Sequence, residues 1–537
     1  MARSPLMRML QRIARDAAVR AHDPAAPAAR RAFLRRSGAL ALAGAAPAWS
    51  RVAAGAERSR VVVVGAGLAG LAAAHELARA GVRATIVEGA PRVGGRCWTE
   101  RGAFADGQIA ERGGELIDTT HETIRTMVAG FGLVLDDLLA SEPAGGEAVA
   151  YFDGAPYALP DVNRDFLAMR PRLLADAEVL GDELPTWRKH TPAQRALDRM
   201  SARQWIDTRV AGGTRSRFGQ LLVNAYGEEL GGDPDEISAV TVVSLLAGSP
   251  ADRFSPYEES DQRFHIRGGN DLLVAKLAEP LAGQIETGGR MVALARLPDG
   301  RLRVTVMRDA AIRDEVVDRV IVAIPFTLLR VVDLTQAGLS ARKRRSIDEL
   351  GMGRNTKLQL QFDRRFWLPR NGSGEYRLAG AFQTTWDVTR AQRGDAGVLN
   401  CFSGGSAAVA AGQGDIDARA RDALADLARA APGAPAQWNG RVIRNAWDRY
   451  PWTLGSYALI KPGQYTSFYG VEAEPAGHVF FAGEHTSIDS QGYLNGAVES
   501  GQRAAGEVLA SLGARRVKAA LAARGALVGA GRSTPAA

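Results

Sequence analysis

The pattern of apolar positions near residue 60 predicts the start of a parallel β-sheet. Four consecutive valines, Val61–Val64, are typical of a strand that is buried on both faces. An alanine- and leucine-rich segment over residues 71–78 follows and predicts a closely packed helix. A second apolar run over residues 84–87 predicts the next strand. The order strand, helix, strand favours an α/β fold.

The middle of the chain alternates between helix-like and strand-like patterns. Residues 136–260 carry leucines and charged residues at helical spacing, interrupted by proline and glycine, and predict a helical cap. Residues 272–277 predict an amphipathic helix. Alternating or fully apolar runs predict strands over residues 291–294, 302–306 and 319–325. These elements are consistent with a sheet-containing domain that is interrupted by a helical insertion.

Composition and charge narrow the functional classes. The 537 residues are 46% apolar and 23% charged, which excludes a disordered chain and a small disulfide-linked scaffold. The formal charge of +8 is concentrated at the termini, because the first 60 residues hold twelve arginines against three acidic residues. The remaining body is mildly acidic, so we expect no nucleic-acid partner. Two cysteines, Cys97 and Cys401, and seven histidines without ligand spacing predict no metal centre.

Residues 1–48 have the order of an export signal. Arg30 and Arg31 precede an apolar run over residues 37–46 and a small-residue site at residues 46–48. This order resembles a twin-arginine signal and implies export machinery as a partner and a periplasmic or extracellular location. A basic leader without that function is the alternative. The apolar run is shorter than the roughly 20 residues that span a bilayer, so we expect no stable membrane insertion.

A glycine-rich turn joins the first predicted strand to the first helix. Gly65, Gly67 and Gly70 have the GxGxxG spacing, which allows a tight turn and a close approach of the backbone to a pyrophosphate. The first N–H groups of the following helix would stabilise the phosphate charge. Glu88 ends the second strand about 20 residues further on, where a carboxylate accepts hydrogen bonds from ribose hydroxyls. Together these features predict a dinucleotide site, with NAD and FAD both open.

Two longer runs resemble a known family. The run from Pro91 to Arg96 is similar to that of the flavin-dependent amine oxidases, and so is the run from Val479 to Gly501. The resemblance covers residues 61–510 and implies FAD as the cofactor. It places the cofactor contacts at Gly65, Gly67, Leu68, Ala69, Gly70, Glu88, Gly89, Arg92, Gly95, Arg96, Gly113, Gly114, Glu115, Val292, Gly483, Glu484 and Ala497.

The resemblance also implies the fold class and the domains. We expect an α/β fold with a discontinuous Rossmann-type FAD-binding domain and an α+β substrate-binding domain. The FAD-binding domain is expected to comprise residues 58–135, 261–335 and 441–512, and the substrate-binding domain residues 136–260 and 336–440. Residues 513–537 are expected to form a flexible tail. The oligomeric state stays open, with a homodimer as one option.

Lys357 is the first candidate catalytic residue. Residues 355–362 alternate between polar and apolar side chains, which predicts a strand with one polar face. From this pattern alone, Lys357 is an exposed edge residue. The resemblance instead aligns it with the active-site lysine of the family, which holds a water against flavin N5. The basic segment at residues 342–345 is interpreted as the solvated face of a helix.

Tyr457 and Tyr493 are the other two candidate catalytic residues. The resemblance aligns them with two aromatic residues that flank the flavin and enclose the substrate amine, with ordinary core packing as the alternative. Trp452 is expected to contact the substrate as well. Ser456 stands where monoamine oxidases carry the cysteine that tethers FAD, so we expect noncovalently bound FAD.

Asp118 bears on the substrate class. It lies where polyamine oxidases have an acidic residue near the amine path, and a carboxylate there attracts a cationic substrate. A helix cap is the alternative interpretation. We therefore predict FAD-dependent oxidation of a primary or secondary mono- or polyamine to an imine, with O2 reduced to H2O2. An L-amino acid oxidase of the same fold and a redox-inert FAD-binding protein are the alternatives.

Overall fold

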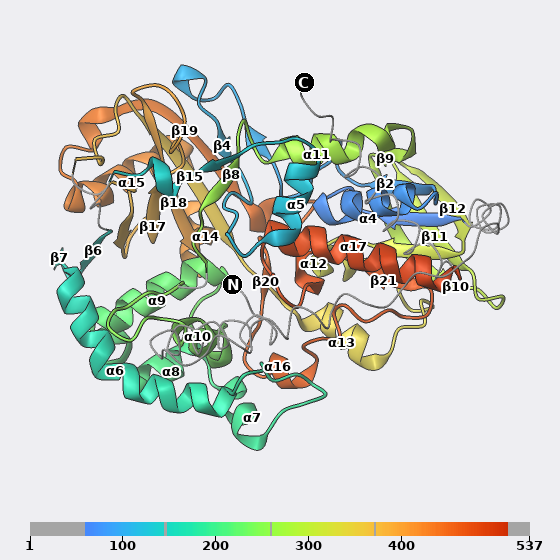
Figure 1. The fold of residues 1–537 in the computed structure, drawn as a ribbon, viewed down its shortest axis with the longest axis horizontal. Coiled ribbons are helices and arrows are strands. Elements are labelled where there is room, and N and C mark those ends of the chain that lie inside the picture. Colours follow the sequence, from blue (N-terminus) through green and yellow to red (C-terminus); the bar gives the residue numbers. More distant parts are fainter. Residues whose placement is uncertain (1–59, 144–147, 258–259, 370–371, 514–537) are drawn as a thin grey trace, which may run out of the picture.

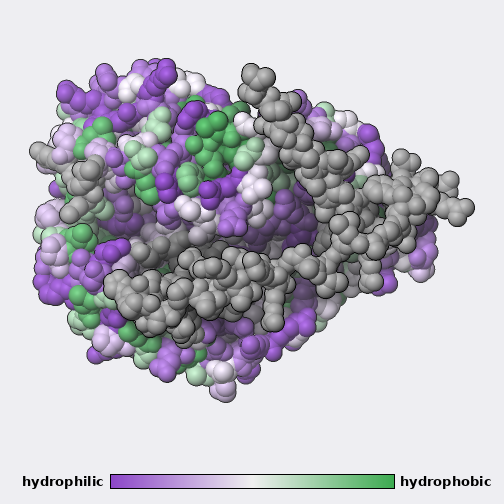
Figure 2. Space-filling view, in the orientation of Figure 1, coloured by the Kyte–Doolittle hydropathy of each residue, from purple (hydrophilic) through white to green (hydrophobic). Residues whose placement is uncertain are grey.

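The fold is organised around two large β-sheets with helices packed against them (Figure 1). The computed structural model describes residues 60–143, 148–257, 260–369 and 372–513. The predicted signal at residues 1–48 and the tail from residue 514 onward lie outside these ranges. Within the described ranges, no helix is both long and apolar enough to cross a bilayer. The face shown in Figure 2 is mostly hydrophilic, and its apolar side chains form separate patches.

The first sheet has five parallel strands and includes the predicted valine strand. In order across the sheet, the strands are β21 (Val479–Phe481), β13 (Arg319–Val322), β1 (Val61–Val64), β2 (Ala84–Glu88) and β9 (Ile285–Thr287). They come from three stretches of the chain that are far apart in sequence. All four residues of β1 are buried, because this central strand is paired on both edges and covered on both faces.

Helices α4 (Leu68–Arg79) and α17 (Leu494–Ser511) pack together against one face of this sheet. Small residues let them approach closely, since a Cβ on Gly501 would lie only 2.3 Å from the carbonyl oxygen of Ala69. Helices α5 (Glu122–Gly130) and α11 (Asp271–Ala278) flank this pair. The other face packs against an antiparallel sheet of β10 (Gly289–Arg296), β11 (Leu302–Arg308) and β12 (Ala311–Val317).

The second sheet has seven strands. Their order is β19 (Trp438–Ala446), β15 (Asn355–Phe362), β18 (Gly397–Gly404), β17 (Thr384–Asp387), β16 (Tyr376–Leu378), β6 (Val149–Phe152) and β7 (Ala155–Pro156). Helix α15 (Ile416–Ala430) packs against the apolar face of β15. Strand β19 pairs with β15 from Ala446 back to Trp438, with one irregularity, so residue 441, a predicted domain boundary, lies inside this strand.

Residues 136–260 contain the predicted helical cap. Its helices are α6 (Leu159–Leu180), α7 (Pro192–Arg199), α8 (Ala202–Arg209), α9 (Arg217–Leu230) and α10 (Ala239–Leu246). They contribute to one large apolar core together with the antiparallel sheet of β10, β11 and β12. Serine or threonine side chains cap α7, α8, α9 and α10 by accepting backbone N–H groups of the first turn.

Short elements complete the fold. They are α12 (Phe326–Leu329), α13 (Ala341–Glu349), α14 (Gly405–Ala411), α16 (Gln464–Ser467), and the paired strands β3 (Thr99–Glu100) with β4 (Ala110–Glu111), β5 (Leu135–Asp137) with β8 (Phe264–Ile266), and β14 (Gly351–Met352) with β20 (Ala458–Leu459).

The basic segment in α13 differs from the expectation of a fully solvated face. Arg342 and Arg345 are exposed, but Lys343 is 2% exposed. Its ammonium donates to the carbonyl oxygens of Val471 and Glu472. A run of four basic residues covers more than one side of a helix, so at least one of them can turn toward the protein interior.

Candidate active site

A cavity of about 600 Å³ receives residues from both halves of the molecule. One group of lining residues, the glycine side, consists of the loop and helix start after β1, the loop after β2, and the start of β10. A second group, the tyrosine side, consists of Glu229, Lys357, Trp386, Tyr457 and Tyr493. The two predicted motifs and the three predicted catalytic residues therefore open onto one space.

Glycines shape the turn after β1. Gly65 has a φ of +105°, and a Cβ there would lie 2.8 Å from the carbonyl oxygen of Ala323, so only glycine fits. Gly70 is equally restricted, because its Cβ would lie 1.9 Å from the carbonyl oxygen of Gly65. Helix α4 has no side-chain cap at Gly67, which leaves its first N–H groups to be satisfied by an anion in the cavity.

Glu88 lines the cavity at the end of β2. Its carboxylate accepts hydrogen bonds from the backbone N–H groups of Ala66 (2.6 Å) and Ala90 (2.7 Å). Burial raises the pKa of Glu88, and these two N–H groups act in the opposite direction. Each carboxylate oxygen retains a second acceptor position. The side chain is thus fixed in a position from which it can receive ribose hydroxyls.

The second glycine-rich segment is joined to the C-terminal motif. Arg96 pairs with Glu484 (2.8 Å) and donates to the carbonyl oxygen of Ser456. Glu484 also accepts the backbone N–H of Gly492 (2.9 Å). Arg92 lies over the ring of Trp98, 3.9 Å from its centroid. Two motifs from opposite ends of the described chain therefore form one continuous wall of the cavity.

The cavity wall contains most of the predicted cofactor contacts. These are Gly65, Gly67, Leu68, Ala69, Glu88, Gly89, Arg92, Gly95, Arg96, Gly113, Gly114, Glu115, Gly483, Glu484 and Ala497. Gly70 lies behind the wall, where it allows α4 to begin directly after the turn. Val292 also lies outside the wall, which is formed there by residues 289–291. The prediction of Val292 rested on the family resemblance, and the structure has a β-bulge between Met291 and Ala293 at this point of β10.

Trp452 lines the cavity on the glycine side rather than beside the tyrosines. A Cβ on Gly89 would lie 2.4 Å from the ring of Trp452, which places this ring next to Glu88. Its predicted contact with the substrate stays a prediction, and the structure places the ring beside the segment that carries Glu88.

Tyr457 and Tyr493 approach the last turn of α9. The Tyr457 hydroxyl donates to the backbone carbonyl oxygen of Glu228 (3.2 Å), and the Tyr493 hydroxyl lies 3.4 Å from a carboxylate oxygen of Glu229. Tyr493 directly precedes α17. Burial raises the pKa of Tyr457, so its hydroxyl stays protonated and can donate.

Lys357 is buried, in contrast to the exposed edge residue that the pattern alone predicts. Strand β15 lies between β18 and β19, and all eight of its residues are buried. Its polar face packs against residues 105–115 instead of solvent. Lys357 Nζ lies 2.6 Å from a carboxylate oxygen of Glu115 and donates to the carbonyl oxygen of Glu111 (3.1 Å).

Asp118 lies outside the cavity and is 0% exposed. Its carboxylate accepts the N–H of Gln262 (2.9 Å) and lies 3.4 Å from Nε2 of His121. The His121 ring packs on Tyr493, with ring centroids 4.8 Å apart. Helix α5 begins at Glu122 without a side-chain cap, so Asp118 is neither a residue of the cavity mouth nor a helix cap. It supports Tyr493 indirectly, through His121.

Sequence reasoning missed Glu229 and Trp386, which both line the cavity. The available signal for Glu229 was a pair of adjacent acidic residues at the end of a largely apolar helix. Glu228, the first of the pair, is buried and contacts Arg377 (3.2 Å), and burial raises its pKa to about 8. Trp386 has no local signal, and it donates from Nε1 to Glu115 (2.8 Å).

Known proteins share this architecture. A family model described as flavin-containing amine oxidoreductase matches residues 68–509. The chain belongs to this family. The L-amino acid dehydrogenase of Synechocystis sp. is 25% identical over 84% of this chain and 95% of its own length. The flavin-containing amine oxidase A of Sus scrofa is 25% identical over 84% of this chain and 85% of its own length.

A solved structure shows the same fold. Cyclohexylamine oxidase from Brevibacterium oxydans IH-35A has a TM-score of 0.72 at 22% identity, with 84% of this chain and 99% of that chain covered. The α/β fold class, with a Rossmann-type FAD-binding part and a second substrate-binding part, is thereby confirmed.

FAD is the cofactor of this family member, and the cavity fits it. The uncapped start of α4 and the fixed carboxylate of Glu88 match a pyrophosphate and a ribose. Ser456 carries no thiol for a covalent link, and its hydroxyl donates to Asn355 (2.5 Å), so FAD is held noncovalently. The protein is an FAD-dependent oxidoreductase that acts on CH–NH groups.

Proposed function

We propose that this enzyme oxidises a primary or secondary amine that carries no carboxylate. Its relatives are named for amino acids as well as for amines, so the site itself has to distinguish the two. The observation that carries the proposal is Glu229 beside Tyr493, because this carboxylate attracts a cationic amine and repels a carboxylate. In the described part of the chain, the arginines that line the cavity are Arg92, Arg96 and Arg290, all outside the tyrosine side.

Each residue of the tyrosine side has a separate role in the proposed reaction. The glycine side would hold FAD, which would supply the acceptor for the hydride of the amine α-carbon and the path of the electrons to O2, with H2O2 as the product. The rings of Tyr457 and Tyr493 enclose the amine and exclude water. The negative charge of the Glu229 carboxylate attracts the cationic amine toward the two tyrosine rings. Lys357 lines the cavity, where its ammonium donates to and orients water.

The test compares amines with amino acids that differ from them only by a carboxylate. Purified FAD-loaded enzyme is mixed without oxygen with tyramine or L-tyrosine, and with putrescine or L-ornithine, while flavin absorbance is followed. We expect the amines to bleach the flavin and H2O2 to form when air is admitted. Bleaching by the amino acids alone would replace the proposal with an L-amino acid oxidase. An unbleached flavin with every compound would favour a redox-inert FAD protein.

We also propose that the enzyme leaves the cytoplasm through a twin-arginine pathway. The support is the order of arginine pair, apolar run and small-residue site in residues 1–48. Fractionation of cells that express the full chain should find the FAD-loaded protein outside the cytoplasm. Lysine at both Arg30 and Arg31 should retain it inside. Wild-type protein that stays in the cytoplasm would contradict this proposal.

A further inference from the structure

Lys357 and Glu115 form an ion pair that is almost completely removed from solvent. Lys357 Nζ and Glu115 Oε2 are 2.6 Å apart, and each side chain is 7% exposed. The other carboxylate oxygen of Glu115 accepts a hydrogen bond from Trp386 Nε1 (2.8 Å). Burial acts to raise the pKa of Glu115, but the Lys357 ammonium, with help from Trp386 and His265, outweighs it, so the pKa lies below its usual value. All three residues line the cavity.

We propose that Glu115 is the fixed counter-ion of Lys357, so that the cavity presents a neutral ion pair, rather than a lone ammonium, to the flavin. Glu115 is then a positioning residue, because it acts on the cofactor through Lys357. Breaking a buried pair by removing one partner leaves an uncompensated charge in a site of low dielectric constant. The pair should therefore influence the reduction of the bound flavin, whichever amine the enzyme oxidises.

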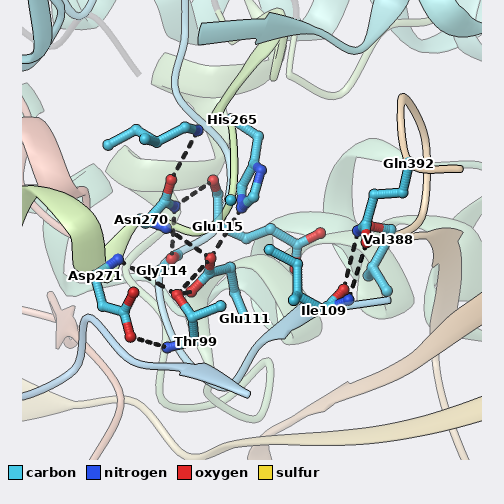
Figure 3. A network of polar contacts seen from close by, with 12 residues as sticks. Thr99, Ile109, Glu111, Gly114, Glu115, His265, Asn270, Asp271, Val388 and Gln392 are labelled. Carbon is cyan, nitrogen blue, oxygen red and sulfur yellow. Dashed lines mark hydrogen bonds and ion pairs between the residues drawn. The ribbon is translucent and has the colours of Figure 1, made fainter. Parts of the chain in front are cut away.

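Glu115 is held in place by the segment that carries it. Figure 3 shows the network around Glu111, whose carboxylate accepts the backbone N–H of Asn270 (2.8 Å) and contacts Nε2 of His265 (2.9 Å). The side-chain amide of Asn270 donates to the carbonyl oxygens of Gly114 (3.1 Å) and Glu115 (2.8 Å). With its backbone fixed and both carboxylate oxygens engaged, Glu115 keeps its carboxylate beside Lys357.

The remaining hydrogen-bond capacity of Lys357 is directed to the cavity. An ammonium has three N–H donors. One is used by Glu115 and a second by the carbonyl oxygen of Glu111 (3.1 Å). Gln359, on the same face of β15, donates to the same carbonyl oxygen (3.2 Å) and keeps it in place. Because Lys357 lines the cavity, the third donor is available there.

The pair has a consequence for the reduction potential. Two-electron reduction adds negative charge to a flavin, so a lone positive charge nearby favours the reduced form. A neutral pair at the same place has a much smaller effect, because the fields of its two charges largely cancel. Removal of the Glu115 charge alone should therefore raise the potential, and removal of both charges should bring it back.

The test is the midpoint potential of the purified FAD-loaded enzyme, measured by anaerobic equilibration with reference dyes. We expect Glu115→Gln to raise the equilibrium constant for reduction at least tenfold, about 30 mV for a two-electron couple. The double variant Glu115→Gln/Lys357→Met should return to within threefold of the wild-type constant. A Glu115→Gln enzyme with an unchanged or lowered potential would overturn the proposal.

Two further variants keep the test decisive if Glu115→Gln does not retain FAD. Lys357→Met leaves the Glu115 carboxylate without its counter-ion, and it should lower the reduction potential at a pH at which Glu115 is ionised. Glu115→Asp preserves the charge and should stay near the wild-type potential. A Lys357→Met enzyme with the wild-type potential would count against the ion pair. The potentials require no substrate, so their outcome is independent of the proposed preference for amines.

Discussion

The glycine side and the tyrosine side of the cavity are built in different ways. On the glycine side, the turn after β1 is shaped by two glycines: a Cβ on Gly70 would meet the carbonyl oxygen of Gly65 in the same turn, and a Cβ on Gly65 would meet that of Ala323, just after β13. On the tyrosine side, Glu229, Lys357 and Tyr493 come from the end of a helix, the middle of a strand and the start of another helix. The turn after β1 is therefore encoded largely by a short motif, whereas the tyrosine side depends on how the two halves of the molecule pack.

The largest effect is expected from a single methyl group on the glycine side. Gly70→Ala would place a Cβ 1.9 Å from the carbonyl oxygen of Gly65 and force the turn apart from α4. We expect FAD binding to weaken by about 100-fold, or about 3 kcal/mol. Isothermal titration of the apoenzyme with FAD measures this change.

A matched substitution in α17 provides the control. Gly506 has no atom within 4 Å of an added Cβ, so Gly506→Ala should bind FAD like the wild type. Equal FAD affinity in the two variants would show that the turn is not the rigid element we describe.

A smaller effect, confined to the substrate, is expected from the tyrosine side. Tyr493→Ala removes a ring that lines the cavity and packs on His121. We expect kcat/KM for amines to fall by about 10- to 30-fold, since ring contacts with a cation contribute up to about 2 kcal/mol. FAD content should not change.

The conservative variant separates the ring from the hydroxyl. Tyr493→Phe should stay within about threefold of the wild type, because the ring provides the enclosing surface. A loss in Tyr493→Phe as large as in Tyr493→Ala would instead assign the effect to the hydroxyl and its contact with Glu229.

The third prediction concerns how the free energy of unfolding depends on pH through His121, whose ring packs on Tyr493. Burial lowers the pKa of His121 from 6.5 to about 3 in the folded protein, so below about pH 6 the unfolded chain binds a proton that the folded chain does not. This contribution to the free energy of unfolding is present above pH 6.5 and is lost as the pH falls. The loss approaches about 1.4 kcal/mol per pH unit.

Denaturant unfolding of wild type and His121→Gln between pH 7 and pH 4.5 measures this contribution. As the pH falls, the free energy of unfolding of the wild type should decrease more steeply than that of His121→Gln. Asp118, whose pKa is raised by burial, acts in the opposite direction but is present in both proteins. Parallel curves would mean that His121 is protonated in the folded state.

The same division between the two sides explains what the sequence could predict. The strand Val61–Val64, the turn at Gly65 and the carboxylate at Glu88 follow from short-range patterns, and the structure shows all three where they were expected. Val292 was placed by the family resemblance, but it lies at a β-bulge, and its neighbour Met291 lines the cavity.

The tyrosine side could be predicted only where the family resemblance reached it. Lys357 is buried because β15 has a neighbour on both edges and residues 105–115 against its polar face, none of which is visible in the strand itself. Glu229 faces the cavity because α9 ends beside Tyr493. Asp118 had the right charge, but it is fully buried behind the cavity wall, where its carboxylate accepts the backbone N–H of Gln262.

The most direct test of the account is the ratio of kcat/KM for tyramine to that for L-tyrosine, measured for the wild type and for Glu229→Gln. We predict a wild-type ratio on the order of 100 or more, since like charges in such a site cost several kcal/mol. In Glu229→Gln the ratio should fall at least tenfold while FAD affinity stays the same. An unchanged ratio, or a wild-type preference for L-tyrosine, would contradict the selection of amines by the tyrosine side.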